Sequence, residues 1–203
     1  MEQRSQEWFD ARLGRVTASR ISDVMMKPDA AGYQNYLAQL VCERLSGNSA
    51  DTGFVSAAMQ HGIDTEPQAQ AVYELTTGNQ VEEVAFVQHP TLMAGASPDG
   101  LIGADGGLEL KCPQPAEHIR MLTGGAIKRQ YLLQMQWGME CTKREWWDFA
   151  TFCPTLPSEM QLCIRRVPFD AEAAANITQA VTTFLTKVEA GVVDLRSRFP
   201  RAA

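Results

Sequence analysis

Two carboxylates and one ammonium lie close together in an otherwise apolar segment, SPDGLIGADGGLELKCP, which spans residues 97–113. Asp99 lies in a Pro-Asp-Gly turn, Glu109 follows ten residues later, and Lys111 comes two residues after Glu109. Carboxylates at one place repel each other unless a cation separates them, and Mg²⁺ typically takes one or two carboxylates with water and substrate phosphate. Such a cation can activate water and stabilise a phosphoryl oxygen, and Lys111 adds a positive donor. These residue types favour metal-assisted cleavage of a phosphodiester.

Local structure must bring these side chains together. Alternation along a strand would place Glu109 and Lys111 on one face and the leucines at 108 and 110 on the other. A hairpin through residues 105–107 would bring Asp99 beside Glu109. A Glu and a Lys two residues apart are also common on solvated strand faces, so the spacing alone leaves that interpretation open.

The apolar periodicity predicts a mixed α/β (α+β) domain, a central mixed β-sheet flanked by helices. Helices are expected at 5–13, from a start capped by Thr17 or Ser19, and at 33–45, 57–76, 127–140 and 170–190. Strands are expected at 81–90, 107–113, 145–152 and 160–167, and 92–102 is expected to be a strand that runs into a turn. Pro67 is expected to interrupt the fourth helix or to begin its second half. The tail at 196–203 is expected to fray.

The bulk composition indicates one ordinary globular domain of 203 residues, 45% of them hydrophobic. A net charge of −6 argues mildly against a nucleic-acid-binding protein, but that argument weakens if some acids hold divalent cations. Five scattered cysteines without a CxxC motif argue against a disulfide framework or a zinc site. No apolar run is long enough to cross a bilayer, and we expect a soluble intracellular protein.

Several motifs together resemble the phage lambda exonuclease family (YqaJ-like viral recombinases) within the PD-(D/E)XK nuclease superfamily. The segments SPDGL and GLELKCP are similar to the nuclease signature, and the similarity runs over most of the chain. The further matching positions are Trp8, Arg12-Leu13-Gly14, Val16-Thr17-Ala18-Ser19, the pair Gly62 and Glu66, and YLLQMQ at 131–136. The combination is far more specific than a bare PD…ExK match.

This resemblance implies a single exonuclease domain over residues 1–203, with 1–60 mainly helical and 80–168 holding the nuclease core sheet. It implies a Mg²⁺-dependent enzyme, with Mn²⁺ as a substitute and two ions per site, that degrades one strand of linear double-stranded DNA 5′→3′. The 3′ overhangs would serve phage-type recombination by strand annealing. The implied partners are duplex DNA, two further copies in a ring-shaped homotrimer, and a phage single-strand annealing protein. The implied location is the cytoplasm of a bacterial host, without a membrane.

The resemblance also assigns roles at the metal site. Asp99 and Glu109 become the principal metal ligands, with the Leu110 backbone carbonyl as a further one. Lys111 becomes the catalytic lysine, and Glu66 becomes a helix-borne acid that binds or positions the second metal. Without the resemblance, Glu66 could equally be a solvated helical glutamate.

The resemblance places other residues on the DNA path. Arg12 matches an arginine that contacts DNA phosphate near the cleaved end, and Thr17 and Ser19 lie where a helix start can bind phosphate. Tyr131 and Gln134 share one helical face and could line the site. The ordinary alternatives are a surface arginine, plain helix capping, and packing with local hydrogen bonds.

Three other functions fit parts of the pattern. A PD-(D/E)XK endonuclease of repair or restriction type would share the metal site but would also cut a closed circle. A catalytically idle DNA-binding subunit would keep the fold, although all four core positions are chemically competent. An iron–sulfur nuclease would need clustered cysteines, which this sequence lacks.

Overall fold

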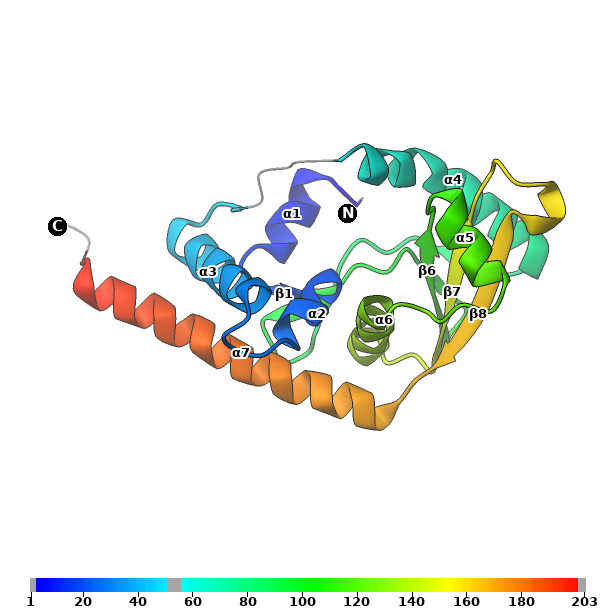
Figure 1. The fold of residues 1–203 in the computed structure, drawn as a ribbon. Helices are drawn as coiled ribbons and strands as arrows, with labels where there is room; N and C mark the ends of the chain where they lie inside the picture. Colours follow the sequence, from blue (N-terminus) through cyan, green and yellow to red (C-terminus); the bar gives the residue numbers. More distant parts are fainter. Residues whose placement is uncertain (1–2, 51–55, 201–203) are drawn as a thin grey trace.

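The structure is a computed structural model that describes residues 3–50 and 56–200. The α-helices are α1 Gln6–Arg12, α2 Ile21–Val24, α3 Ala31–Ser46, α4 Ala57–Thr77, α5 Pro115–Leu122, α6 Arg129–Thr142 and α7 Ala171–Arg198. The strands are β1 Val16–Thr17, β2 Val81–Glu82, β3 Val87–Gln88, β4 Ala94–Ala96, β5 Gly100–Ile102, β6 Gly106–Lys111, β7 Trp146–Phe152 and β8 Leu162–Pro168. Two 3₁₀ turns, η1 Ala18–Arg20 and η2 Ser158–Met160, complete the described elements. Figure 1 shows helices α1 to α3 at one end of the molecule and the larger sheet at the other.

The larger sheet has five strands in the order β2-β5-β6-β7-β8. Strands β6 and β7 pair in parallel, and the other neighbours are antiparallel. A parallel pair needs a long crossover, which α5 and α6 provide here. The sheet is therefore mixed, and helices cover it, so the predicted fold class is confirmed.

The two faces of this sheet pack against different helices. On one face, Leu108 and Leu110 of β6 are buried with Tyr73 of α4. On the other face, Phe149 of β7 is buried with Met135 of α6. The predicted alternation along β6 is thus present: the leucines face α4, and the residues between them face the side that α6 covers.

A second, three-stranded sheet joins the N-terminal segment to the turn that carries Asp99. Its order is β1-β4-β3, with β1 parallel to β4 and Thr17 opposite Gly95. Strand β4 belongs to this small sheet, and β5 belongs to the large one. Asp99 therefore lies in the short connection between β4, which pairs with the strand of Thr17, and β5 of the large sheet.

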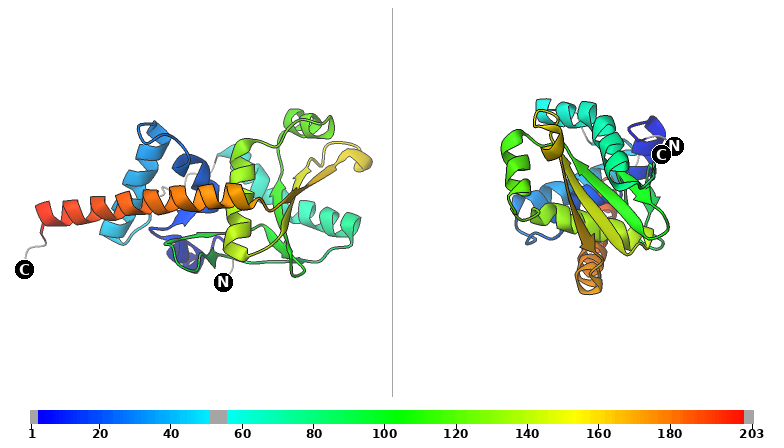
Figure 2. Two further views of the ribbon diagram at one scale, coloured as in Figure 1. Left: turned by 90° about the horizontal axis from the view of Figure 1, so that it is seen from below. Right: turned by 90° about the vertical axis from the view of Figure 1, so that its right-hand side faces the viewer.

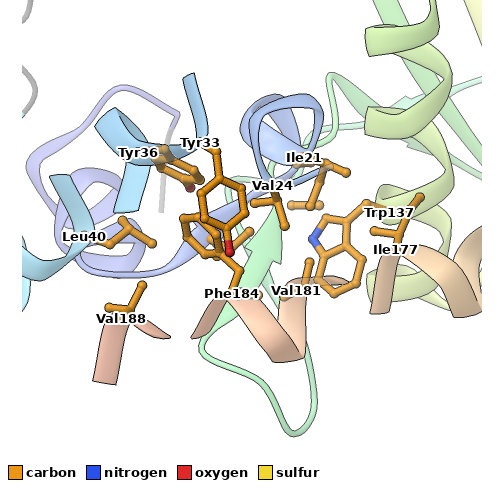
Figure 3. Close-up of a cluster of buried hydrophobic side chains, with 14 of the residues drawn as sticks. Ile21, Val24, Tyr33, Tyr36, Leu40, Trp137, Ile177, Val181, Phe184 and Val188 are labelled. Carbon is orange, nitrogen blue, oxygen red and sulfur yellow. The ribbon is translucent and has the colours of Figure 1, made fainter. Parts of the chain in front are cut away.

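The long helix α7 organises the main core beside the small sheet. Its apolar stripe, which includes Ile177, Val181 and Phe184, packs against α2, α3 and Trp137 of α6. Figure 3 shows Phe184 between the side chains of α3 and those of α2, next to Val181. The Phe184 ring packs on both Tyr33 and Tyr36, with ring centroids 4.9 Å and 5.4 Å away. This core holds α3 and the small sheet in place behind the candidate site.

Some predicted elements are wrong in detail. The segment 81–90 forms two short strands in different sheets, β2 and β3, instead of one. Helix α4 runs through Pro67 without interruption, because packing on the sheet outweighs one lost backbone hydrogen bond. The expected frayed tail is helical as far as Arg198, and Figure 2 shows this end of α7 projecting beyond the rest of the molecule. Residues 201–203 of that tail lie outside the described residues.

Two further differences concern local signals. The predicted helix start at Thr17 or Ser19 is a strand end followed by the 3₁₀ turn η1, and Thr17 makes no side-chain cap. Helix α5 was not predicted, although Pro115 at its start is a typical first-turn residue. Among the described helices, none is long and apolar enough to cross a membrane.

Candidate active site

Three oxygen atoms surround the ammonium of Lys111. Its Nζ lies 2.5 Å from Oε1 of Glu109, 3.0 Å from the carbonyl oxygen of Leu110 and 3.8 Å from Oδ2 of Asp99. The Glu109 side chain is only 2% exposed, whereas the Asp99 and Lys111 side chains are 18% and 27% exposed. Glu109 therefore lies at the buried base of the site, and Asp99 and Lys111 are partly accessible to solvent.

The hairpin of β5 and β6 creates this cluster. Gly100 pairs with Leu108, so Asp99 immediately precedes the ladder and lies beside Glu109. Asp99 Oδ2 accepts a hydrogen bond of 2.7 Å from the backbone N–H of Leu110, which fixes the carboxylate. The predicted meeting of Asp99, Glu109 and Lys111 is present in the structure.

The electrostatics of the cluster show an excess of negative charge. Burial, together with the neighbouring Glu109, raises the pKa of Asp99 to about 8, although Lys111 opposes the shift. Burial alone would lower the pKa of Lys111, but Glu109 and Asp99 outweigh it and raise that pKa above its ordinary value. One ammonium thus only partly offsets two carboxylates, and a divalent cation would relieve this repulsion.

Helix α6 closes the site from one side with the two residues expected there. Gln134 donates a hydrogen bond of 2.6 Å from Nε2 to Oε1 of Glu109. The Tyr131 ring stacks on Phe149 with centroids 5.5 Å apart, and Lys111 Nζ lies 5.4 Å from the Tyr131 centroid. Both residues therefore contact the cluster, in addition to the packing that was the alternative.

A cleft of about 520 Å³ opens in front of Asp99, and we call it the acidic cleft. Its described lining includes the carboxylates of Asp99, Glu66 and Glu83. Glu66 extends from α4 and forms an ion pair of 3.0 Å with Arg4. Glu66 is therefore in the same cleft as Asp99, as expected for the helix-borne acid, but it is engaged with a cation of the chain itself.

A second cleft of about 480 Å³ adjoins the first, and we call it the basic cleft. Arginines dominate the charge of its described lining, which contains Arg4, Arg12, Arg15 and Arg20 with Glu43 as the counter-charge. The predicted phosphate-binding residues Arg12, Thr17 and Ser19 all line it. The Thr17 and Ser19 hydroxyl oxygens lie 3.4 Å apart. The structure brings these three residues together in the basic cleft. Arg4 lines this cleft as well as the acidic cleft.

The position of Arg12 is set by contacts that link it to the Asp99 turn. Its guanidinium lies 3.8 Å from the centroid of the Trp8 ring, and Nη1 donates to Ser97 Oγ at 3.2 Å. The indole N–H of Trp8 donates to the same oxygen at 2.9 Å. Ser97 is two residues from Asp99, so this hydrogen bond connects Arg12 of the basic cleft to the turn that carries Asp99.

The loop before β1 depends on a glycine. Gly14 has a φ of +66°, a conformation that residues with side chains rarely adopt. Its N–H donates to Oε2 of the buried Glu43 at 2.9 Å, and Arg44 Nε donates to its carbonyl at 2.9 Å. This turn carries the chain from Arg12 into β1 and so places Arg12 and Thr17 at the same cleft.

The comparisons with known proteins identify the family of the chain. The sequence pattern of the YqaJ-like viral recombinase domain matches residues 7–145. Two crystal structures of an alkaline exonuclease (LHK-Exo) from Laribacter hongkongensis are 44% identical, over 96% of this chain and 97% of theirs. Their TM-scores are 0.90, for the complex with dAMP, and 0.89.

The chain belongs to the YqaJ-like viral recombinase family. A phage-related exonuclease from Haemophilus somnus shares the fold, with 13% identity, a TM-score of 0.69, and coverage of 89% of this chain and 96% of that one. No curated protein matches the chain in a sequence search. The suspected family is confirmed.

The residues present in this family member fit a hard divalent cation. Asp99 Oδ2, Glu109 Oε1 and the Leu110 carbonyl already converge on one positive centre, the Lys111 ammonium. Oxygen donors of this kind are those that Mg²⁺ and Mn²⁺ prefer. Within residues 3–50 and 56–200, no three His, Cys, Asp or Glu side chains cluster closely enough to form a metal site by themselves.

Among the residues that line or join the two clefts, sequence reasoning gave no site role to Arg4, Arg20, Glu83 and Ser97. Arg20 lies over the Tyr36 ring at 4.1 Å and donates from Nε to Asp23 at 2.5 Å. The crowding of arginines in the first 27 residues was visible in the sequence, and it was the available signal for Arg4 and Arg20. Nothing in the sequence indicated that Ser97 would meet Arg12.

Proposed function

We propose that the chain is a divalent-metal-dependent exonuclease that degrades one strand of linear double-stranded DNA in the 5′→3′ direction. The convergence of Asp99, Glu109 and the Leu110 carbonyl around one positive centre carries the proposal. The family membership supports it, since the 44% identical relative is named an alkaline exonuclease. That relative was crystallised with dAMP, which belongs to the class of product that such an enzyme releases.

The carboxylates of the acidic cleft and the cluster around Lys111 have distinct places in the proposed reaction. Asp99, Glu109 and the Leu110 carbonyl would hold Mg²⁺ or Mn²⁺, and Glu66 would bind or position a second ion. When bound, the ions would make a coordinated water more acidic and would stabilise negative charge on the phosphoryl group. Lys111 donates hydrogen bonds to the attacking water or to the phosphoryl oxygen. Gln134 holds the Glu109 carboxylate through its hydrogen bond, and Tyr131 shields the apolar side of the site.

The basic cleft explains how such an enzyme would begin at an end. A terminal 5′ phosphate carries more negative charge than an internal diester and offers oxygens that a guanidinium can meet with two parallel donors. Arg12 supplies this guanidinium, and the hydroxyl-bearing residues Thr17 and Ser19 line the same cleft. The first nucleotide would then reach into the acidic cleft next to it.

The biological setting of the proposal is phage-type homologous recombination. Digestion of one strand leaves a 3′ single-stranded overhang, which is the substrate of a single-strand annealing protein. We propose that three copies of the chain form a ring around the duplex, in the cytoplasm of a bacterial host of the phage or prophage. Light scattering on the purified protein would test the trimer directly, with a mass near that of one copy as the contradicting result.

Digestion of linear duplex with and without a 5′ phosphate, in Mg²⁺ and followed strand by strand, tests the proposal. The expected result is stepwise loss of the 5′-phosphorylated strand into mononucleotides, while its complement persists. A covalently closed circle is the control and should remain intact. Cutting of the circle would indicate an endonuclease, and binding without any digestion would indicate an idle DNA-binding subunit.

A further inference from the structure

The N-terminal residues Gln3 and Arg4 are fastened across the junction of the two clefts. Gln3 Nε2 donates to the carbonyl of Val84 at 3.0 Å and to that of Pro98, next to Asp99, at 2.7 Å. Arg4 has a φ of +67°, a left-handed conformation that residues with side chains rarely adopt. Unusual backbone conformations of this kind persist where surrounding contacts hold them, often at functional sites. These contacts hold the segment in place and fix the backbone of Arg4 at the junction of the two clefts.

Arg4 is the cation shared by both clefts. Among the described lining residues, Arg4 and Ile63 alone belong to both the acidic and the basic cleft. The Arg4 guanidinium donates from Nη2 to Glu66 Oε2 at 3.0 Å, at the acidic side. A strand that enters from Arg12 and reaches Asp99 would pass this guanidinium.

The contact between Arg4 and Glu66 is suited to exchange. The two side chains are 49% and 29% exposed, so water and salt screen their attraction. Exposed ion pairs contribute little to stability, whereas a guanidinium and a phosphate form strong, two-pronged hydrogen bonds. An incoming phosphate can therefore compete with Glu66 for Arg4.

We propose that Arg4 is a substrate-binding residue that exchanges Glu66 for a backbone phosphate of the strand being degraded. Binding of the phosphate frees the Glu66 carboxylate, which would then be available to a divalent cation held by Asp99. Substrate and metal binding are coupled in this way through a single side chain. The inference rests on the proposed function, because it assumes that DNA spans the two clefts.

Equilibrium binding without turnover tests this role. A fluorescent, 5′-phosphorylated duplex is titrated in EDTA and again in Ca²⁺, with wild type, Arg4→Ala, Arg4→Lys and Arg198→Ala. Arg198 is a matched control, because it also forms an exposed ion pair, with Asp194 at 2.9 Å, but lies on α7. Thermal unfolding confirms that each variant is folded.

We expect Arg4→Ala to weaken binding about tenfold and to lower the log–log salt slope by roughly one unit, as for the loss of one phosphate contact. Arg4→Lys should keep the slope but recover only part of the affinity, since Lys cannot form the two-pronged contact. Arg198→Ala should match wild type. An Arg4→Ala affinity and slope equal to those of Arg198→Ala would overturn the inference.

A double-mutant cycle with Glu66→Gln separates direct binding from an indirect effect. If Arg4 contacts phosphate itself, Arg4→Ala still lowers the salt slope in the Glu66→Gln background. If Arg4 only neutralises Glu66, the affinity loss disappears in that background, and the inference is wrong. A wild-type chain that binds duplex without digesting it contradicts the proposed nuclease function and not this inference.

Discussion

The acidic and the basic cleft lie side by side but differ in charge and in the elements that line them. The acidic cleft is lined by α4, the loop between β2 and β3, the N-terminal segment and the Asp99 turn, and its carboxylates are Asp99, Glu66 and Glu83. The basic cleft is built by α1, its following loop and α3, and arginines dominate its charge. The first can hold cations for chemistry, and the second can hold phosphate for positioning.

This difference shows why net charge alone is a poor guide here. The whole chain carries a net charge of −6, which argued against a nucleic-acid-binding protein. The small sheet, however, gathers arginines of the first 20 residues on one side of the Asp99 turn and leaves the acids on the other. A local separation of charge can therefore serve DNA in an acidic protein.

The largest expected effect comes from removal of metal, because it disables one cleft and spares the other. Excess EDTA should abolish digestion of linear duplex, while binding to the basic cleft persists. Mg²⁺ or Mn²⁺ should restore digestion, whereas Ca²⁺ should support binding without turnover because of its looser geometry. Parallel digestion and anisotropy assays check this, and full digestion in excess EDTA would contradict it.

Loss of the Lys111 ammonium should have the next largest effect. Lys111→Ala should reduce the single-turnover rate about 10²-fold or more with DNA binding nearly unchanged, as for loss of a transition-state contact. Lys187→Ala is a matched control, since Lys187 Nζ lies 5.1 Å from the centroid of Tyr33, much as Lys111 lies near Tyr131. A loss of affinity without a change in single-turnover rate would make Lys111 a phosphate contact.

Arg12 should show a smaller and more selective effect at the basic cleft. Arg12→Ala should slow initiation on 5′-phosphorylated ends about tenfold, because a charge-assisted hydrogen bond is lost, and should hardly affect 5′-hydroxyl ends. The two substrates should then become nearly equal, and Arg12→Lys should restore the preference only in part. Equal slowing of both substrates would assign end recognition to another residue.

The mildest perturbation is salt, which should act chiefly on the contacts between arginines and phosphate. Binding of duplex should weaken with roughly one unit of log–log slope for each phosphate that the arginines neutralise. The single-turnover rate at saturating enzyme should stay nearly constant over the same range, because the buried carboxylates are weakly screened. Titrations between low and moderate salt measure both quantities, and salt-independent binding would refute a phosphate-tracking path.

The core of the site was predictable because its geometry is local. Strand alternation and one hairpin suffice to bring Asp99, Glu109 and Lys111 together, and both follow from the pattern of apolar residues and turn signals. Gln134 and Tyr131 could be placed on one face of α6 by helical spacing, but their contacts with Glu109 and Lys111 required the family resemblance or the structure.

Other features could not be predicted because they depend on pairings distant in the sequence. Residues 81–90 have one continuous strand pattern, yet the chain divides them between two sheets whose partners lie elsewhere. Pro67 signals a helix break, but the packing of α4 on β6 and β7 overrides that local preference. Helix α5 is short and was missed because periodicity over eight residues is a weak signal.

The sequence by itself determined the mixed α/β class, the family and the side chains that meet at the cation position, since all three depend on short-range pattern and motif. The tertiary structure decided where the arginines go. Pairing of β1 with β4 places Thr17 opposite Gly95, and the bond from Arg12 to Ser97 joins the N-terminal helix to the Asp99 turn. Those contacts connect residues about 80 positions apart. Such long-range pairings are set by the burial of the whole core and by the register of two sheets, which no local pattern encodes.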